Sequence, residues 1–234
     1  MNDNRPSTPS AVRRVLRKES GFGCCLCGHP FIQYHHIVPW HEDQHFRPED
    51  MMTLCAQCHH LCTVEAIPIS DQRTAKSRPK NIVDNELKGR LWVTSRELRV
   101  NLAGGTAIET PNLLQIAGET VLGARLDQDT GRVLISAQIR APDGKLLAKI
   151  VDNEWSMRPD SVWDFEVFPR HATVRLGPSD IAFSVDTRGD SVNLQGKWFH
   201  NGHKIEFSQS KATIGNNQLV GFNVAHCNVM ISVG

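Results

Sequence analysis

Two pairs of cysteines with the same spacing are the first feature of this chain that could do chemistry. Cys24 and Cys27 form one CxxC pair, and Cys55 and Cys58 form the other. Each pair can present two thiolates to one tetrahedral ion, and four thiolates close a zinc site without leaving a position for water. We therefore expect a structural Zn²⁺ here, with a binding free energy of ~10–16 kcal/mol that also stabilises the fold.

Cysteine and histidine are concentrated in this same stretch. Six of the seven Cys and seven of the eleven His lie between residues 24 and 62. A disulfide framework needs an oxidising compartment, and the opening MNDNRPSTPSAVRR has no apolar core that could act as a signal peptide. We therefore expect metal ligands and a cytoplasmic protein. Cys25 and Cys62 are spare thiols, although either could replace a member of the zinc site.

The segment between the two CxxC pairs carries two adjacent histidines, His35 and His36. Residues 31–39 and 50–55 have the pattern of two strands, and a helix that carries His59 follows them. A strand pair followed by a helix would place the three histidines close together. An open cation site with few protein ligands leaves coordination positions for water and for phosphate oxygens.

This combination of motifs resembles the HNH endonuclease family, whose pattern is CxxC, then HHIxPW or DHIxP, then NLxxLCxxCH. The resemblance covers about residues 10–66, roughly a quarter of the chain. The C-terminal half resembles no family that we can name. The matching residues are Cys24, Cys27, His35-His36-Ile37-Val38-Pro39-Trp40, Asp50-Met51 and Leu54-Cys55-Ala56-Gln57-Cys58-His59.

The resemblance implies a ββα-metal finger that hydrolyses phosphodiester bonds, with double-stranded DNA as the expected partner. It makes His35 and His59 the ligands of a divalent cation (Mg²⁺, Mn²⁺, Ni²⁺ or Zn²⁺) and His36 the general base that activates water. A metal can stabilise the leaving oxygen, and an imidazole with a pKa near 6.5 can accept a proton at neutral pH. Asp50 stands where the family usually has the Asn that holds the hairpin loop and orients the base.

Two positions depart from the family pattern. The carboxylate of Asp50 can accept the hydrogen bonds of the usual amide but cannot donate as an amide does. Thr63 stands where some relatives carry a further metal-binding His. The alternative is therefore a catalytically inert, zinc-finger-like nucleic-acid-binding or regulatory subunit. Three other histidines of this block are expected to be helix-surface or loop residues and not ligands: His41, His45 and His60.

A basic helix is expected before the first CxxC pair. Ser7, Thr8 and Pro9 form a helix start with a hydroxyl cap and a proline in the first turn, and Gly21 and Gly23 end the helix. Beside a phosphodiesterase site we expect its cations to contact the DNA backbone, the alternative being a solvated helix face. These cations are Arg13, Arg14, Arg17 and Lys18.

The whole chain is predicted to be an α+β protein with three parts. Residues 1–70 form the HNH-like nuclease module with its basic helix, residues 71–105 a basic linker with one short helix, and residues 106–234 an all-β domain. Short strand-like runs with turn signals predict an antiparallel sandwich or a short β-solenoid in this last part. It has 12 basic and 14 acidic residues. Its net charge of −2 argues against a role as a simple DNA clamp. We therefore expect this domain to supply specificity or control, through a homo-oligomer interface or a regulatory ligand.

Composition excludes several protein classes. The net charge of +1, with 40% hydrophobic and 22% charged residues, is typical of an ordinary globular protein. No apolar run approaches the ~20 residues that a membrane span needs, so no membrane partner is expected.

Overall fold

The computed structural model describes residues 6–234, so the first five residues of the expected N-terminal module lie outside the described residues. The chain divides into two compact units, with the boundary between Leu87 and Lys88. Strands make up 44% of the residues and helices 17%. The protein is therefore mixed α+β and mostly β.

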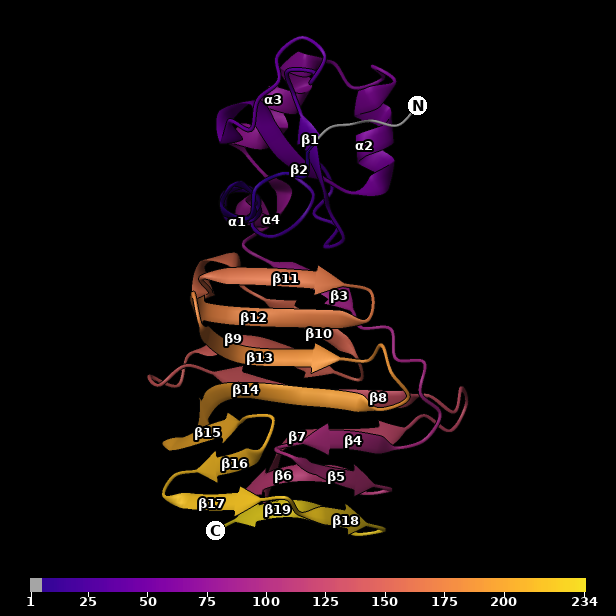
Figure 1. Ribbon diagram of the computed structural model, residues 1–234, viewed down its shortest axis with the longest axis vertical. Coiled ribbons are helices and arrows are strands. Elements are labelled where there is room, and N and C mark those ends of the chain that lie inside the picture. The colour runs from indigo at the N-terminus through magenta and orange to yellow at the C-terminus, as the bar shows by residue number, and fades with distance from the viewer. Residues whose placement is uncertain (1–5) are drawn as a thin grey trace. The chain divides into compact units, whose positions relative to one another are not determined.

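The first unit contains four helices, one short 3-10 helix and one two-stranded sheet among its described residues (Figure 1). Their order along the chain puts a hairpin and a helix at the centre of the unit. The elements are α1 (Ser10–Glu19), β1 (Gln33–His36), η1 (Pro48–Asp50), β2 (Met51–Leu54), α2 (Ala56–Thr63), α3 (Ile69–Ser77) and α4 (Lys80–Asp84).

The predicted order of strand, strand and helix around the histidines is confirmed. Strands β1 and β2 are antiparallel, with Gln33 opposite Leu54 and His36 opposite Met51. Helix α2 follows β2 directly, with Cys55 as its N-cap residue. All four residues of β2 are buried, so the hairpin rests on the core of the unit.

That core is small and rich in sulfur. A cluster of buried residues includes Cys24, Cys25, Cys55 and Cys62 together with a few aliphatic side chains. A core of this size contributes little stability to a unit of fewer than ~90 residues, and such units commonly depend on a metal or a disulfide. The fold of the first unit is therefore suited to a structural metal ion.

Residues 71–105 do not form the expected linker. They contain most of α3, all of α4 and the first two strands of the second unit, β3 (Leu87–Arg90) and β4 (Arg99–Leu102). The two helices are held by buried polar side chains, Gln72 and Asn81, which are 3% and 4% exposed. Because amide side chains anchor these helices, their sequences lack the regular spacing of apolar residues from which helices are predicted.

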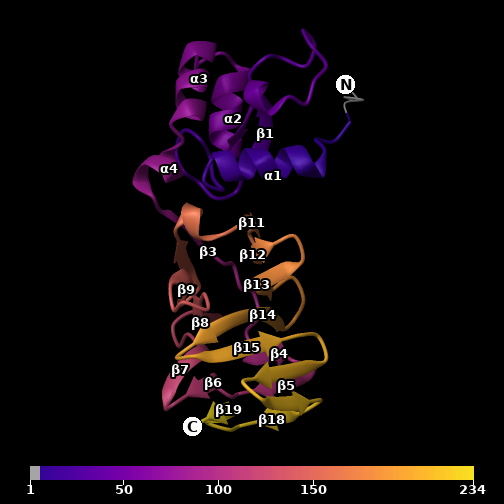
Figure 2. The same cartoon turned by 90° about the vertical axis from the view of Figure 1, so that its left-hand side faces the viewer.

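The second unit consists of strands and one short 3-10 helix. After β3 and β4 come β5 (Gly105–Ile108), β6 (Asn112–Ile116), β7 (Glu119–Leu126), β8 (Val133–Arg140), β9 (Leu146–Val151), β10 (Glu154–Met157), η2 (Pro159–Ser161), β11 (Asp164–Phe168), β12 (His171–Gly177), β13 (Asp180–Asp186), β14 (Val192–His200), β15 (His203–Phe207), β16 (Lys211–Ile214), β17 (Asn217–Val220), β18 (Asn223–Ala225) and β19 (Val229–Val233). Figure 2 shows two layers edge-on, with β7, β8 and β9 in one and β4, β5, β12 and β13 in the other.

Most neighbouring strands are antiparallel, but parallel pairs also occur among the described residues. Strand β4 pairs with β14, β5 with β18 and β6 with β19. The sheet is thus mixed, which differs from the purely antiparallel sandwich expected as one alternative. Parallel pairing joins segments that are far apart in the sequence, so local turn signals could not reveal it.

Strand β14 connects the two layers. Its first half pairs with β13 and β4, and its second half pairs with β15. Gly196 lies at the change of partner with a φ of +155°, and a Cβ there would come 2.4 Å from the Ala182 carbonyl oxygen. Beyond it, Trp198 packs edge-on against Phe183 and Phe207 at centroid distances of 5.7 and 5.4 Å. Glycine therefore allows the bend that places this tryptophan in the core.

Among the described residues, no helix has both the length and the apolar character needed to cross a membrane.

Candidate metal centre and histidine cluster

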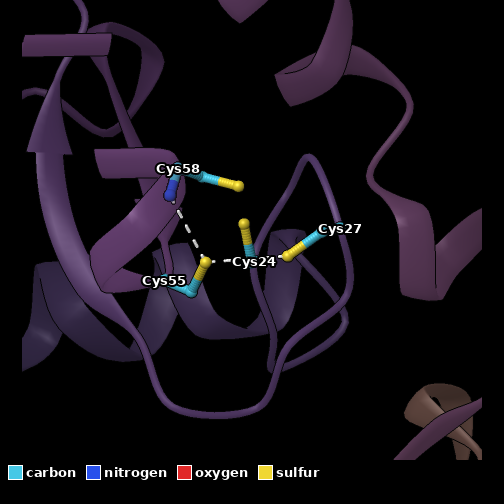
Figure 3. A group of neighbouring side chains, drawn as sticks. All are labelled: Cys24, Cys27, Cys55 and Cys58. Carbon is cyan, nitrogen blue, oxygen red and sulfur yellow. Dashed lines mark hydrogen bonds between the residues drawn. The ribbon is translucent and has the colours of Figure 1, made fainter. Parts of the chain in front are cut away.

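The four cysteines of the two CxxC pairs come together in the first unit. The sulfur atoms of Cys24, Cys27, Cys55 and Cys58 all lie within 4.8 Å of one another, and Figure 3 shows them pointing toward a common centre. The Cys27 and Cys55 sulfurs are 3.6 Å apart. Tetrahedral zinc with Zn–S bonds of ~2.3 Å places its sulfurs at about this separation. The arrangement is that of a metal site with four sulfur ligands.

Backbone hydrogen bonds shape the first cysteine pair into a tight loop. The Gly28 N–H donates to the Cys24 carbonyl at 2.8 Å, and the Cys24 N–H donates to the His29 carbonyl at 2.9 Å. Gly28 has a φ of +78°. From α4, the Asn81 amide donates to the carbonyls of Gly21 and Gly28 at 3.2 and 3.1 Å. The helix that sequence analysis placed in a linker therefore supports the metal loop.

The crowded thiols cannot all ionise without a cation. Burial raises the pKa of Cys27 to about 11 and also raises the pKa of Cys58. Burial acts in the same direction on Cys55, but hydrogen bonds donated by the Cys58 backbone and by neighbouring thiols outweigh it and lower the pKa of Cys55. Four thiolates at this separation require a bound positive charge, and zinc is the ion that such a donor set prefers.

His35 lies beside His59, and its ring is oriented by a side chain from α3. The two rings are perpendicular, with centroids 5.0 Å apart. His35 Nε2 is 3.1 Å from Gln72 Oε1, and the Gln72 amide nitrogen donates to the Ile67 carbonyl at 2.9 Å. Because this second bond fixes the amide as an acceptor toward the ring, His35 Nε2 carries the proton. The neutral ring then has its lone pair on Nδ1.

His36 is held in the same way by a backbone carbonyl. Its Nε2 donates to the carbonyl oxygen of His45 at 2.9 Å, and the residue is only 8% exposed. The rings of Trp40, His45 and Phe46 surround it at centroid distances of 5.4, 5.1 and 5.9 Å. The other ring nitrogen, Nδ1, is also buried. His45 was expected to be a helix-surface or loop residue; it lies in a loop and is buried.

Asp50 closes the loop between the two strands by ion pairing. Arg73 of α3 donates to one carboxylate oxygen at 2.6 Å and to the Glu49 carbonyl at 2.8 Å, and Arg47 donates to the other oxygen at 3.0 Å. These hydrogen bonds, with Arg73 first and Arg47 second, lower the pKa of Asp50. The Asp50 carbonyl accepts the Ile37 N–H at 2.8 Å, next to His36. A carboxylate here thus holds the loop through arginines.

The basic helix α1 presents fewer cations than expected. Arg17 is 7% exposed and donates to the Tyr34 hydroxyl at 2.9 Å, so it packs inside the unit and does not face a ligand. Its position follows Leu16 on the buried side of the helix, where a long side chain can reach a polar partner. Arg13 and Lys18 are exposed and Arg14 is half-buried.

Sequence analysis missed three residues that hold this site: Gln72, Arg73 and Asn81. They lie in a polar segment without a motif, so no local signal could have identified them. Thr63 donates to the His59 carbonyl at 2.9 Å and is not a further ligand. Within residues 6–234, the cysteine group is the one place where three or more ligating side chains converge.

Comparisons of the chain with protein-family models, with curated proteins and with solved structures give no match.

Proposed function

We propose that this chain is a metal-dependent endonuclease of the HNH type that hydrolyses phosphodiester bonds in double-stranded DNA. The observation that carries the proposal is the state of the two adjacent histidines. Both His35 and His36 have Nε2 within hydrogen-bond distance of an uncharged acceptor, which orients the two rings. One of them lies beside a third histidine, His59.

In this proposal the histidines have separate roles. His35 and His59 would hold a divalent cation, which when bound would stabilise charge on the scissile phosphate and on the leaving oxygen. His36 would accept a proton from water, and the hydrogen bond from its ring to the His45 carbonyl would keep the ring oriented. Asp50 would position the loop that carries His36. The four cysteines would keep a structural zinc ion.

DNA contact is proposed for the exposed cations of α1. Arg13 and Lys18, with Arg14 beside them, would meet backbone phosphates, whereas the buried Arg17 would not. The second unit would supply specificity or control, through a ligand or a second copy of the chain.

Supercoiled-plasmid cleavage tests the proposal. The wild type is expected to convert the plasmid to nicked or linear DNA with at least one of Mg²⁺, Mn²⁺, Ni²⁺ and Zn²⁺, and His36→Ala is expected to lose at least 100-fold in rate. His41→Ala is the matched control, since that imidazole lies in the same loop but is 82% exposed. Equal cleavage by His36→Ala would reject the assigned base. Binding without cleavage would support the inert zinc-stabilised module instead.

A further inference from the structure

A polar groove of about 700 Å³ lies on one face of the second unit. Strands β4, β5, β12, β13 and β14 form its floor, and the turn between β15 and β16 forms one wall. The groove has no part in the proposed nuclease site, and its lining residues come from the second unit alone.

The floor of the groove is one row of polar residues that crosses adjacent strands. Residues that pair directly across neighbouring strands point to the same face of a sheet. In Figure 1 the strands of this row follow one another along the unit. In order from β12 to β5 the members are His171, Asp186, Asn193, Asn101 and Thr106.

Hydrogen bonds within the row fix several of its amides. The Asn101 amide donates to Asn193 Oδ1 at 2.9 Å, and the Thr106 hydroxyl donates to Asn101 Oδ1 at 3.0 Å. Two other amides of the lining, Gln195 and Gln209, make no side-chain hydrogen bond among the described residues. Each offers two donors and one carbonyl acceptor. The groove therefore combines a rigid polar floor with amides that can bind a ligand.

The charges of the groove cancel. Arg188 donates through Nε to both carboxylate oxygens of Asp186, at 3.0 and 3.1 Å. His171 Nε2 is 3.1 Å from the Thr173 hydroxyl, whereas its Nδ1 is buried and has no hydrogen-bond partner among the described residues. Burial lowers the pKa of His171, so its ring is neutral at pH 7. The groove thus offers donors and acceptors without net charge.

An exposed aromatic ring lies at the end of this row. Phe168 of β11 pairs with His171, so it points to the same face, and it is 61% exposed. A flat apolar ring next to amides suits a ligand with one C–H face and many hydroxyl groups. A phosphate backbone would need several cations, but Arg188 is the one cationic side chain in the lining. The lining also has no pair of aromatic rings between which a base could stack.

We propose that this groove binds a neutral saccharide. Every sugar hydroxyl is both a hydrogen-bond donor and an acceptor. The amides of Gln195 and Gln209 and the Asp186–Arg188 pair offer both donors and acceptors to such hydroxyls. The saccharide could be a free glycan or a hexose attached to a DNA base. The inference does not depend on the nuclease proposal.

Calorimetric titration of the full chain tests this proposal. The probes are glucose, galactose, mannose and N-acetylglucosamine with their oligomers, a duplex with glucosylated 5-hydroxymethylcytosine, and the same duplex unmodified. Gln195→Leu is expected to weaken saccharide binding about tenfold. Gln218→Leu is the matched control, because that amide is exposed on β17, outside the groove. Thermal unfolding of both variants would show that the fold is unchanged.

Each outcome either distinguishes a free glycan from a sugar on DNA or contradicts saccharide binding by the groove. Binding of free sugars that Gln195→Leu weakens supports a glycan site, and binding of the glucosylated duplex above the unmodified one supports a sugar on DNA. Equal binding of both duplexes, weakened by Gln195→Leu, would show a nucleic-acid surface and overturn the proposal. Absence of saccharide binding, or binding that Gln195→Leu leaves unchanged, would also overturn it.

Discussion

At the scale of single residues, the candidate nuclease site depends on hydrogen bonds to the far side of its histidine rings. Gln72 and the His45 carbonyl each accept from an Nε2–H, and both acceptors come from segments without a recognisable motif. Such partners typically change metal affinity or activity 10- to 100-fold when they are removed. The histidines themselves could be predicted from their spacing, but the partners that select their tautomers could not.

Gln72→Leu is therefore expected to lose about tenfold or more in cleavage rate, because His35 Nε2 would have no acceptor. Gln72→Glu keeps an acceptor oxygen and should recover part of that rate. A ¹⁵N NMR measurement of the His35 tautomer gives a readout without metal or DNA. The spectrum should show the Nε2–H tautomer in the wild type and a mixture of the two tautomers in Gln72→Leu. Gln33→Leu is the control, because Gln33 is exposed. An unchanged tautomer in Gln72→Leu would contradict the assignment.

Asp186 is expected to make stability depend on pH in the second unit. Hydrogen bonds from Arg188 lower its pKa to about 2, below the value of ~3.9 in an unfolded chain. The stabilisation is therefore complete above pH ~4 and fades as the pH falls toward 2. The pKa shift limits the contribution of Asp186 to the free energy of unfolding to about 2.5 kcal/mol. Screening by solvent reduces this contribution to about 1 kcal/mol.

Urea unfolding of Asp186→Asn against the wild type measures this effect. Tryptophan fluorescence reports mainly on the second unit, which contains four of the five tryptophans. The stability difference at pH 7 should shrink as the pH approaches 2. A difference that stays constant across this range would show that ionisation of Asp186 is not its source.

At the scale of elements, turn chemistry was the most reliable guide. Asn201-Gly202 and the Pro-Asp-Gly segment at 142–144 have sequences typical of hairpin turns, and they join β14 to β15 and β8 to β9. Both Asn201 and Gly202 have positive φ, as a primed turn requires. One short helix was expected within residues 71–105, but α3 and α4 both lie there, and buried amides in place of an apolar stripe anchor them. The expected hydroxyl cap of α1 is also wrong, since the helix begins at Ser10 without a side-chain cap.

Gly196→Ala is expected to destabilise the second unit by about 2–3 kcal/mol. The added methyl group would lie against the Ala182 carbonyl where β14 changes partner, and overpacking of a buried strand has an effect of this size. Gly189→Ala is the control, because nothing lies within 4 Å of a Cβ there, and its change should stay within about 0.5 kcal/mol. Equal stability of the two variants in urea would refute the role of Gly196.

At the scale of the whole molecule, the two units differ in what stabilises them. The first unit has a small core around four sulfur ligands. The second unit has an extensive apolar core that contains Trp155 and Trp198. The α+β class and the β character of the C-terminal part could be predicted from composition and turns. The mixed sheet could not, because its parallel pairs have no local signal.

Removal of zinc should therefore unfold the first unit and leave the second folded. We expect a chromophoric chelator to release one Zn²⁺ per chain, after which amide hydrogen exchange increases before Leu87 and not after it. Cys24→Ser should abolish zinc retention, whereas Cys227→Ser, an exposed thiol of the second unit, should not affect it. Continued protection of the first unit without zinc would contradict this dependence.

The parallel pairs also set an order in time as the chain is synthesised. Val100 pairs with Val192, Ala107 with Val224, and Asn112 with Val229. Strands β4, β5 and β6 therefore leave the ribosome long before their partners exist, and contacts of this sequence separation form slowly. The first unit is complete in sequence by then and can bind its metal during translation. A nascent chain would thus hold a folded N-terminal unit while the early strands of the second unit still await partners, which is the interval in which they are most exposed to aggregation.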